Sequence, residues 1–402
     1  MSADLIVTGI GELVTNARDS IDLLGLVGDA AIAVEDGIVV WAGPEADLPD
    51  AHRDSPLLDV GGRAVIPGFV DAHTHLVFAG DRSDEFGRRL SGESYHQILA
   101  AGGGIHSTVA ATRQASDEML IADAIARAMR MLASGTTTVE VKSGYGLDTA
   151  TEVRMLQAAA AVGEATPLDV VPTFLGAHVV DKGADREDYL RLVIGEMLPA
   201  CAPLARFCDV FADDGAFTVE EAEAVLQAGI AHGLRPRVHA EQLAPTGAAA
   251  MAARLGAASA DHLDHVTAAD AEALRKAGTI AVLLPAASFS MRAPQAPGRM
   301  LWDAGVTVAL ATDCNPGTSY VESMPLVVAI ACLEMGLTPA EAVWAATRGG
   351  ALALEMPDRG WIGKGAVADL VVLDAPSYLH LPYRPGTALV HAVVKGGAVV
   401  SG

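Results

Sequence analysis

Basic residues are scarce in this sequence: 27 Lys and Arg stand against 50 Asp and Glu among 402 residues. The formal net charge of -23 at pH 7 argues against nucleic acid or an anionic membrane as a partner, because both repel a strongly acidic surface. An anionic small molecule is compatible with this charge if a few arginines gather at its binding site. We therefore expect a small-molecule substrate, no nucleic acid and no membrane.

Cysteines, aromatic residues and long apolar runs are also few. The four cysteines form no C-x-x-C pair, which excludes a disulfide scaffold and is typical of a reducing compartment. No uninterrupted apolar run reaches membrane-spanning length, and the start of the chain lacks the basic residues of a signal peptide. Aromatics make up 4% of a chain that is 51% apolar, so its core must consist mainly of Ala, Val, Leu and Ile. We expect a globular, cytoplasmic protein.

The two ends of the chain share a pattern of short apolar segments separated by turn residues. Asp36-Gly37 and Gly396-Gly397 are among the turns and indicate β-hairpins. Strands are expected at residues 4–7, 30–34, 38–42, 57–60, 368–374 and 388–400. We predict one small β-sandwich domain built from residues 1–63 and 360–402.

The middle of the chain alternates apolar strand-like runs with Ala-rich helical runs. After a first run that begins at Val65, strands are expected at residues 136–141, 168–173, 207–211, 235–238, 257–260, 279–283 and 306–311. Helices are expected at residues 117–133, 151–161, 219–232 and 268–277, and Thr218 followed by Glu221 is typical of a capping box. This alternation predicts an α/β fold, a (β/α)8 TIM-like barrel over residues 64–359. An open doubly wound sheet is the alternative, but no G-x-G-x-x-G follows a strand.

The first apolar run ends in His73 and His75, which are separated by one residue. Alternate side chains of a strand lie on the same face, so both imidazoles should point the same way. Two neutral imidazoles held together are suitable ligands for zinc or iron. An isolated His-x-His is more often one buried and one exposed histidine. Whether this pair binds a metal therefore depends on further ligands on later strands.

The ends of three later strands provide such ligands. The fifth strand ends in His239, the sixth in His262 and the eighth in Asp313. In a barrel of this kind the C-terminal strand ends meet around one site. Each residue alone is more often a hydrogen-bonded core residue or a solvated loop residue, but together they favour a metal site of three histidines and one aspartate.

Seven motifs give the chain a resemblance to a known enzyme family. They lie at residues 70–75, 78–82, 101–105, 139–147, 174–178, 239–243 and 312–319. On these motifs nearly the whole sequence resembles the amidohydrolase superfamily, and within it the branch that hydrolyses 4-imidazolone-5-propanoate to N-formimidoyl-L-glutamate in histidine degradation. The resemblance implies a metal-dependent hydrolase of a cyclic amide C–N bond, with one Zn2+ or Fe3+ ion per subunit, that forms a homodimer.

The resemblance also implies which residues form the site. The metal ligands would be His73, His75, His239 and Asp313. The substrate contacts would come from Arg82, Tyr145, His178, Gln242, Asn315, Gly317 and Thr318. The candidates for catalytic proton transfer are His262, Asp313 and His178, and the sequence leaves open which of them is the principal base.

The chemistry of the substrate suggests physical roles for some of these residues. Arg82 offers a planar donor fork for the substrate carboxylate, and Tyr145 could add a hydroxyl. Asn315 and the backbone that follows it could recognise ring N–H and C=O groups. The alternatives are a loop ion pair of Arg82 with Asp81 or Asp84, and a plain turn at the Asn-Pro-Gly segment.

Gln242 lies three residues after the histidine of the fifth strand, where related deaminases often carry a proton-transferring glutamate. Glutamine only hydrogen-bonds at neutral pH, so proton transfer should occur elsewhere. The adjacent Glu241 should point away, because successive strand residues face opposite sides. The fourth strand also lacks the carboxylated lysine of binuclear relatives, since Lys142 lies on the second strand. One metal is therefore favoured over two.

Two alternative functions use the same residues. A purine or pyrimidine deaminase, or another cyclic amidine deaminase, is disfavoured by Gln242 and by the Arg82–Tyr145 pair. A catalytically dead barrel scaffold would be expected to lack at least one ligand, and none is missing.

A Gly-rich segment follows the first strand of the predicted barrel. Gly102-Gly103-Gly104 lies in a long excursion, which is the wrong context for a phosphate-binding loop. We expect residues 101–108 to form a mobile loop near the site.

Overall fold

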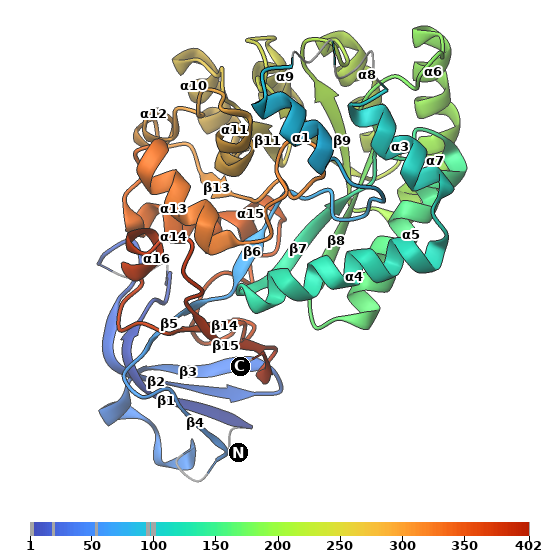
Figure 1. Cartoon of the computed structure of the whole chain (residues 1–402). Coiled ribbons are helices and arrows are strands. Elements are labelled where there is room, and N and C mark those ends of the chain that lie inside the picture. Colours follow the sequence, from blue (N-terminus) through green and yellow to red (C-terminus); the bar gives the residue numbers. More distant parts are fainter. Residues whose placement is uncertain (1–3, 18–20, 53–54, 94–96, 98–101, 402) are drawn as a thin grey trace.

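A computed structural model describes residues 4–17, 21–52, 55–93, 97 and 102–401 of the chain. This part contains two sheets of eight strands each (Figure 1). One sheet forms the barrel, and the other contains strands from both ends of the chain and lies below it in the view. No helix within these described ranges is long and apolar enough to cross a membrane.

The barrel sheet has the strand order β13-β12-β11-β10-β9-β8-β7-β6, and its neighbouring strands are parallel. Its strands are β6 (Phe69–Asp71), β7 (Thr136–Lys142), β8 (Asp169–Ala177), β9 (Phe207–Ala212), β10 (Arg235–Ala240), β11 (Ser259–His262), β12 (Ile280–Leu283) and β13 (Val308–Leu310). Every residue of β7 and β12 is buried, because such strands are covered on both faces. The predicted (β/α)8 architecture is confirmed.

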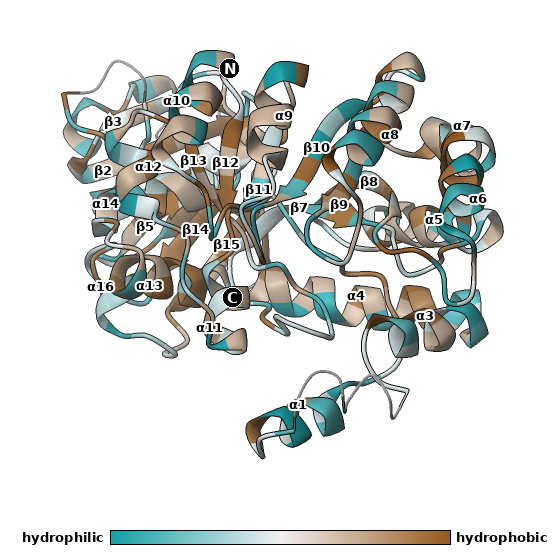
Figure 2. Cartoon of the chain, turned by 90° about the horizontal axis from the view of Figure 1, so that it is seen from above, coloured by the Kyte–Doolittle hydropathy of each residue, from teal (hydrophilic) through white to brown (hydrophobic). Residues whose placement is uncertain are grey.

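Helices surround the barrel, and apolar residues gather in the strands between them (Figure 2). The helices are α1 (Ser83–Leu90), α3 (Ile105–Gln114), α4 (Asp117–Ala133), α5 (Thr149–Ala165), α6 (Arg186–Leu192), α7 (Leu198–Cys201), α8 (Val219–Ala231), α9 (Ala248–Leu255), α10 (Ala268–Ala277), α11 (Pro285–Met291), α12 (Gly298–Asp303), α13 (Met324–Glu334), α14 (Pro339–Trp344), α15 (Gly350–Ala353) and α16 (His380–Tyr383). The capping box predicted at the start of α8 is present, because Thr218 and Glu221 each accept the other's backbone N–H. Helix α1 stands apart from the barrel in Figure 2.

The barrel closes through residues that follow β6 and β13. Thr74 and Cys314 form an isolated parallel bridge between the two segments. The backbone N–H of His75 donates to the carbonyl of Cys314 at 2.9 Å, and that of Asp313 donates to the carbonyl of His73 at 3.0 Å. Closure of the barrel therefore places three of the predicted metal ligands, His73, His75 and Asp313, on two neighbouring segments joined by backbone hydrogen bonds.

The second sheet has the order β16-β15-β14-β5-β1-β2-β3, with β4 paired to β1. Its strands are β1 (Leu5–Leu13), β2 (Val27–Glu35), β3 (Ile38–Pro44), β4 (Leu57–Asp59), β5 (Ala64–Pro67), β14 (Leu370–Leu373), β15 (Val390–Lys395) and β16 (Ala398–Ser401). They enclose an apolar cluster separate from the core of the barrel. The expected sheet from both ends of the chain is thus present, while the exact domain limits, 1–63 with 360–402 and 64–359, stay a prediction.

The first apolar run was expected to form a single barrel strand, and in this respect the prediction was wrong. Residues of β5 pair with β14 and β1 in the second sheet, whereas β6 pairs with β7 in the barrel. The chain crosses between the sheets at Gly68, whose N–H donates to the carbonyl of Asp369. A Cβ at Gly68 would lie 2.3 Å from Oγ1 of Thr137, so only glycine fits at this crossing.

The Gly-rich segment at residues 101–108 is only partly a loop. Ala101 lies outside the described residues, and helix α3 already begins at Ile105. The N–H of Gly104 donates to the carboxylate of Glu85, and the hydroxyl of Ser107 donates to the same carboxylate. The expectation of a loop up to residue 108 was wrong, because this hydrogen-bonded start of α3 is anchored to α1.

Candidate metal centre

The four predicted ligands converge at the C-terminal ends of the barrel strands. Nε2 of His73 lies 3.6 Å and Nε2 of His75 lies 3.5 Å from Oδ1 of Asp313. Nε2 of His239, on β10, lies 3.4 Å from Nε2 of His75. Ligand atoms placed tetrahedrally about 2.0–2.2 Å from a zinc ion lie about 3.3–3.6 Å from one another. These distances fit metal binding, and the described residues offer two overlapping groups of three whose ligand atoms lie within 4.8 Å of one another: His73, His75 and Asp313, and His73, His239 and His262.

Two imidazole nitrogens of these ligands lack the partners that buried polar atoms normally have, and one of them, Nε2 of His73, faces Asp313. Among the described residues, Nε2 of His73 and Nδ1 of His75 have no hydrogen-bond partner, although both rings are buried. Nε2 of His239 faces Nε2 of His75, and two unprotonated nitrogens facing each other would leave both lone pairs unsatisfied. A cation bound by the Nε2 atoms of His73, His75 and His239 would use these lone pairs.

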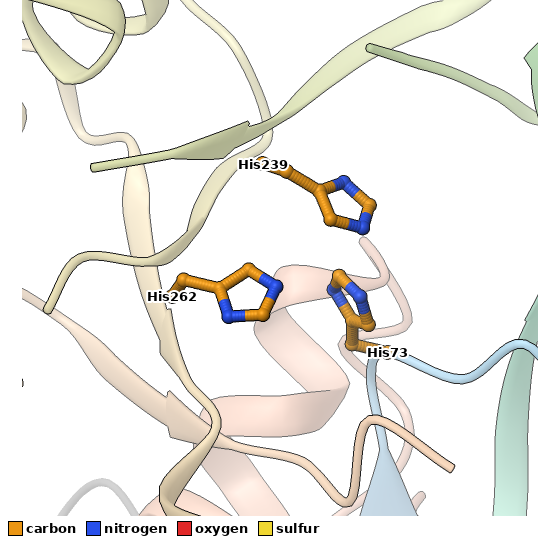
Figure 3. Close-up of side chains that lie close together, drawn as sticks. All are labelled: His73, His239 and His262. Atoms are coloured by element: carbon orange, nitrogen blue, oxygen red, sulfur yellow. The ribbon is translucent and has the colours of Figure 1, made fainter. Parts of the chain in front are cut away.

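His262, the last residue of β11, lies in the same cluster, as its place at the end of the sixth barrel strand predicted. Its ring centroid is 5.3 Å from that of His239 and 5.5 Å from that of His73, and the three imidazoles point toward one another (Figure 3). Nδ1 of His262 has no partner within the described part of the chain. His262 and Asp313 have positive φ angles of 75° and 52°, a strained conformation that is concentrated at functional sites.

Burial controls the electrostatics of this cluster. It lowers the pKa of His73, His75 and His262 well below the usual value, so their imidazoles are neutral at pH 7, which is the form that binds metals. Burial also raises the pKa of Asp313 well above its usual range. A bound cation would offset this cost and favour the charged carboxylate.

His178 and Tyr145 lie beside the metal ligands. The ring of His178 stacks on His75 with centroids 5.1 Å apart, and the ring of Tyr145 lies 5.3 Å from that of His178. Nδ1 of His178 lies 2.9 Å from the carbonyl oxygen of Gly144, so Nδ1 carries the proton and Nε2 is left as an acceptor. Burial lowers the pKa of His178 to about 3, so this ring is neutral at physiological pH.

Arg82 lines a cavity of about 380 Å³ together with Gly317 and Thr318. Its guanidinium pairs with Glu85 at 2.9 Å, rather than with Asp81 or Asp84 as the alternative interpretation held. The guanidinium also lies against Gly317, where a Cβ would come within 2.3 Å of Nη1 of Arg82. Three predicted substrate contacts thus share one cavity.

Comparison with known proteins identifies the family of this chain. Residues 64–400 match the Amidohydrolase family. The chain is 52% identical over 400 residues to an imidazolonepropionase of Mycolicibacterium smegmatis, covering 98% of this chain and 97% of the relative. It is 52% identical over 399 residues to an imidazolonepropionase of Salinispora arenicola, covering 98% of each. The chain belongs to the imidazolonepropionase family. Imidazolonepropionases are hydrolases that act on a carbon–nitrogen bond of a cyclic amide, and this chain is one of these hydrolases.

A solved structure shows the same fold. An adenosine deaminase from Xanthomonas campestris with bound zinc superimposes with a TM-score of 0.76 at 22% identity, covering 99% of this chain and 93% of that chain. At this identity the likeness shows the fold alone. The amidohydrolase family and the cluster of His73, His75 and Asp313 together indicate that this imidazolonepropionase family member holds a metal ion.

In this imidazolonepropionase family member, the side chain of Asn315 stabilises the Asn-Pro-Gly turn. This agrees with the alternative interpretation of the segment as a plain turn. Its Oδ1 accepts from the N–H groups of Gly317 and Thr318, each at 2.8 Å. Its Nδ2 donates to the carbonyl of Asp313 at 2.7 Å and to the hydroxyl of Thr318 at 2.9 Å. Both amide hydrogens and both lone pairs are therefore used within the turn. A direct contact with substrate would have to replace one of these bonds.

The loop that carries Gln242 is held by another carboxylate. Asp213 accepts from the backbone N–H groups of Gln242 and Leu243 at 2.6 and 2.9 Å. Glu241 is buried and accepts from Gly247 and Ala249 at the start of α9. Its carboxylate is therefore turned toward α9, although Glu241 follows the end of β10 and has a positive φ of 54°, so strand alternation is not the reason.

Sequence reasoning missed the carboxylates behind the ligand histidines. Oδ2 of Asp261 lies 2.7 Å from Nδ1 of His73, and Oδ2 of Asp209 lies 3.1 Å from Nδ1 of His239. Arg89, which lines the same cavity as Arg82, was also missed. The available signal was charge inside apolar strands: Asp209 lies between Cys208 and Val210 in a buried run. An imidazolonepropionase site predicted from its ligands alone therefore omits the groups that orient them.

Proposed function

We propose that this chain hydrolyses the ring of 4-imidazolone-5-propanoate to N-formimidoyl-L-glutamate. The observation that carries the proposal is the presence of two features: a converging set of metal ligands, and a cavity lined by Arg82, Arg89 and the segment Pro316–Tyr320 that follows Asp313. The first suits hydrolysis of an amide, and the second suits a carboxylate. In a chain of net charge -23, arginines at a cavity favour an anionic substrate.

The metal would be one Zn2+ or Fe3+ ion held by His73, His75, His239 and Asp313. Three imidazoles and one carboxylate suit zinc and also accept iron. When bound, such an ion supplies a water that is nucleophilic at neutral pH and polarises the carbonyl under attack.

The substrate would lie with its propanoate on Arg82 and its ring toward the histidines. Tyr145 would add a hydroxyl, and Gln242, Gly317 and Thr318 would contribute polar contacts, with Asn315 holding the turn. His178 would orient the ring, because its free Nε2 can accept a ring N–H while its Nδ1 is bound to Gly144. The same free Nε2 would also make His178 a candidate for proton transfer.

The other candidates for proton transfer are Asp313 and His262. Water adds its oxygen to the ring carbonyl carbon, the carbon–nitrogen bond breaks, and the leaving nitrogen takes a proton. The imidazole of His262 is neutral at pH 7 and its Nδ1 is free, so it can accept or pass a proton at this point. Asp313 is the third candidate, since its Oδ1 faces the same space.

The decisive experiment follows the loss of imidazolonepropionate absorbance with metal-loaded protein. The His73→Ala variant should lose activity by several orders of magnitude and should hold less metal. His265→Ala is a matched control, because His265 is a half-buried histidine just after β11 that belongs to neither cluster of potential ligands. Equal turnover by His73→Ala and the parent protein would refute the proposal, whereas release of ammonia from guanine or cytosine would support a deaminase.

We further propose that the protein is a cytoplasmic homodimer. The scarcity of cysteine and the relatives support a reducing compartment and a role in histidine degradation. Light scattering of the purified chain tests its assembly, and a monomeric mass would refute the dimer.

A further inference from the structure

A cluster of buried charges lies directly behind the metal ligands and is not used by the proposed reaction. Its members are Glu140, Lys142, Asp209, Arg237 and Asp261, and each has 0% relative exposure. We call them the outer cluster. Burying charged groups is costly unless they are paired and hydrogen-bonded, so this concentration needs an explanation.

Two carboxylates of the outer cluster contact ligand histidines. Asp261 is 2.7 Å from Nδ1 of His73, and Asp209 is 3.1 Å from Nδ1 of His239. A carboxylate only accepts, so each Nδ1 must carry the proton, and the Nε2 lone pair is left for the metal. His75 differs, because its Nδ1 has no partner among the described residues.

The two cations of the outer cluster hold these carboxylates in place. Nζ of Lys142 lies 2.7 Å from Asp209, 2.8 Å from Glu140 and 3.8 Å from Asp261. Nη2 of Arg237 lies 3.1 Å from Asp261 and donates to the carbonyl of Ala72, the residue before His73, at 2.8 Å. Lys142 therefore connects the supports of two ligands that come from different strands.

We infer that Asp209 and Asp261 are positioning residues that fix the metal-binding tautomers of His239 and His73, and that Lys142 couples them. The inference rests on the proposed metal centre. Lys142 touches no ligand, yet metal affinity should depend on it, because without its ammonium Asp209 loses the hydrogen bond that orients it and Asp261 loses a cation 3.8 Å away. Outer-shell partners of this kind typically change metal affinity about 10- to 100-fold.

The test measures zinc affinity by competition with a chelator, using the full-length chain stripped of metal. Asp209→Asn should weaken zinc binding about 10- to 100-fold. The asparagine oxygen would turn toward Lys142, its NH2 group would face Nδ1 of His239, and the proton would move to Nε2. Lys142→Met should weaken zinc binding comparably. Asp369→Asn is the matched control, since Asp369 is also buried and pairs with Lys395 at 2.8 Å, and its zinc affinity should be unchanged.

A second readout is the tautomer itself, from 15N spectra of histidine in the same metal-free proteins. The parent protein should show protonated Nδ1 at His73 and His239, and Asp209→Asn should change only His239. Circular dichroism establishes that each variant is folded, and if Lys142→Met does not fold, the isosteric Asp209→Asn and Asp261→Asn variants decide.

These measurements separate the inference from the proposed function. Folded Asp209→Asn with parental zinc affinity and an unchanged His239 tautomer would overturn the inference, even if the parent hydrolyses imidazolonepropionate. Outer-cluster variants that lose affinity would support it, even if that substrate is not turned over. A parent chain that binds neither zinc nor iron would overturn both.

Discussion

The contact between Gly317 and Arg82 allows a substitution that tests substrate recognition without touching the metal ligands. In Gly317→Ala the new Cβ would lie 2.3 Å from Nη1 of Arg82, so the guanidinium must move. The backbone of Gly317 does not require positive φ, and the atom displaced is the end of a flexible side chain, so the fold should tolerate alanine. The effect should therefore fall on binding.

The size of the effect follows from the bond that is lost. A hydrogen bond to a charged group contributes about 1.5–3 kcal/mol, which corresponds to a loss of about 10- to 150-fold in kcat/KM. Most of this loss should appear in KM, because a remote carboxylate contact stabilises the bound substrate and the transition state alike.

The assay measures initial rates of imidazolonepropionate loss over a range of substrate concentrations. An analogue whose carboxylate is capped as an amide should be affected much less by Gly317→Ala, since it does not need the guanidinium. Gly87→Ala is the control, because Gly87 lies on α1 next to Phe86 and its Cβ would meet open space. Parental kcat/KM in Gly317→Ala, or an equal loss with the capped analogue, would refute the assignment of Arg82.

Two further predictions concern Arg89 and Asp264. Arg89→Gln should lower kcat/KM several-fold at about 0.01 M salt and hardly at all at about 1 M salt. The reason is that salt screens the attraction between Arg89 and an anionic substrate. Equal salt dependence of kcat/KM in variant and parent would contradict this prediction. Burial raises the pKa of Asp264 to about 7 from the usual 3.8, so the folded state holds a proton that the unfolded chain releases. Stability should fall as the pH rises from about 4 through about 7, by at most about 4 kcal/mol. Asp264→Asn should therefore raise the melting temperature at pH 8 and not at pH 4, and a gain independent of pH would contradict this.

Local patterns predicted the elements that depend on neighbouring residues. The helices predicted at 117–133 and 268–277 agree with α4 and α10 at both ends. Both begin after a side chain that accepts a backbone N–H of the first turn, Ser116 for α4 and Thr267 for α10. Such caps can be read from sequence because they join residues only three positions apart.

The run that begins at Val65 shows what local sequence patterns cannot predict. An apolar β-branched run predicts a buried strand, but it does not indicate which sheet the strand joins. The structure divides the run at Gly68 between two sheets, because its hydrogen-bond partners on β14 and β7 lie far along the chain.

The sequence by itself determined the barrel, the positions of its strands and the kinds of side chain at their ends, because alternation and capping are local. Only the tertiary structure decided that His73, His75 and Asp313 meet on adjoining backbone, through the closing bridge between Thr74 and Cys314. It also decided which residues hold these ligands in position. In the sequence Lys142 is an isolated lysine on the second barrel strand, but in the structure its ammonium binds a carboxylate of the fourth barrel strand. The physical reason is that a buried charge must find its partner across strands, and no sequence spacing records that distance.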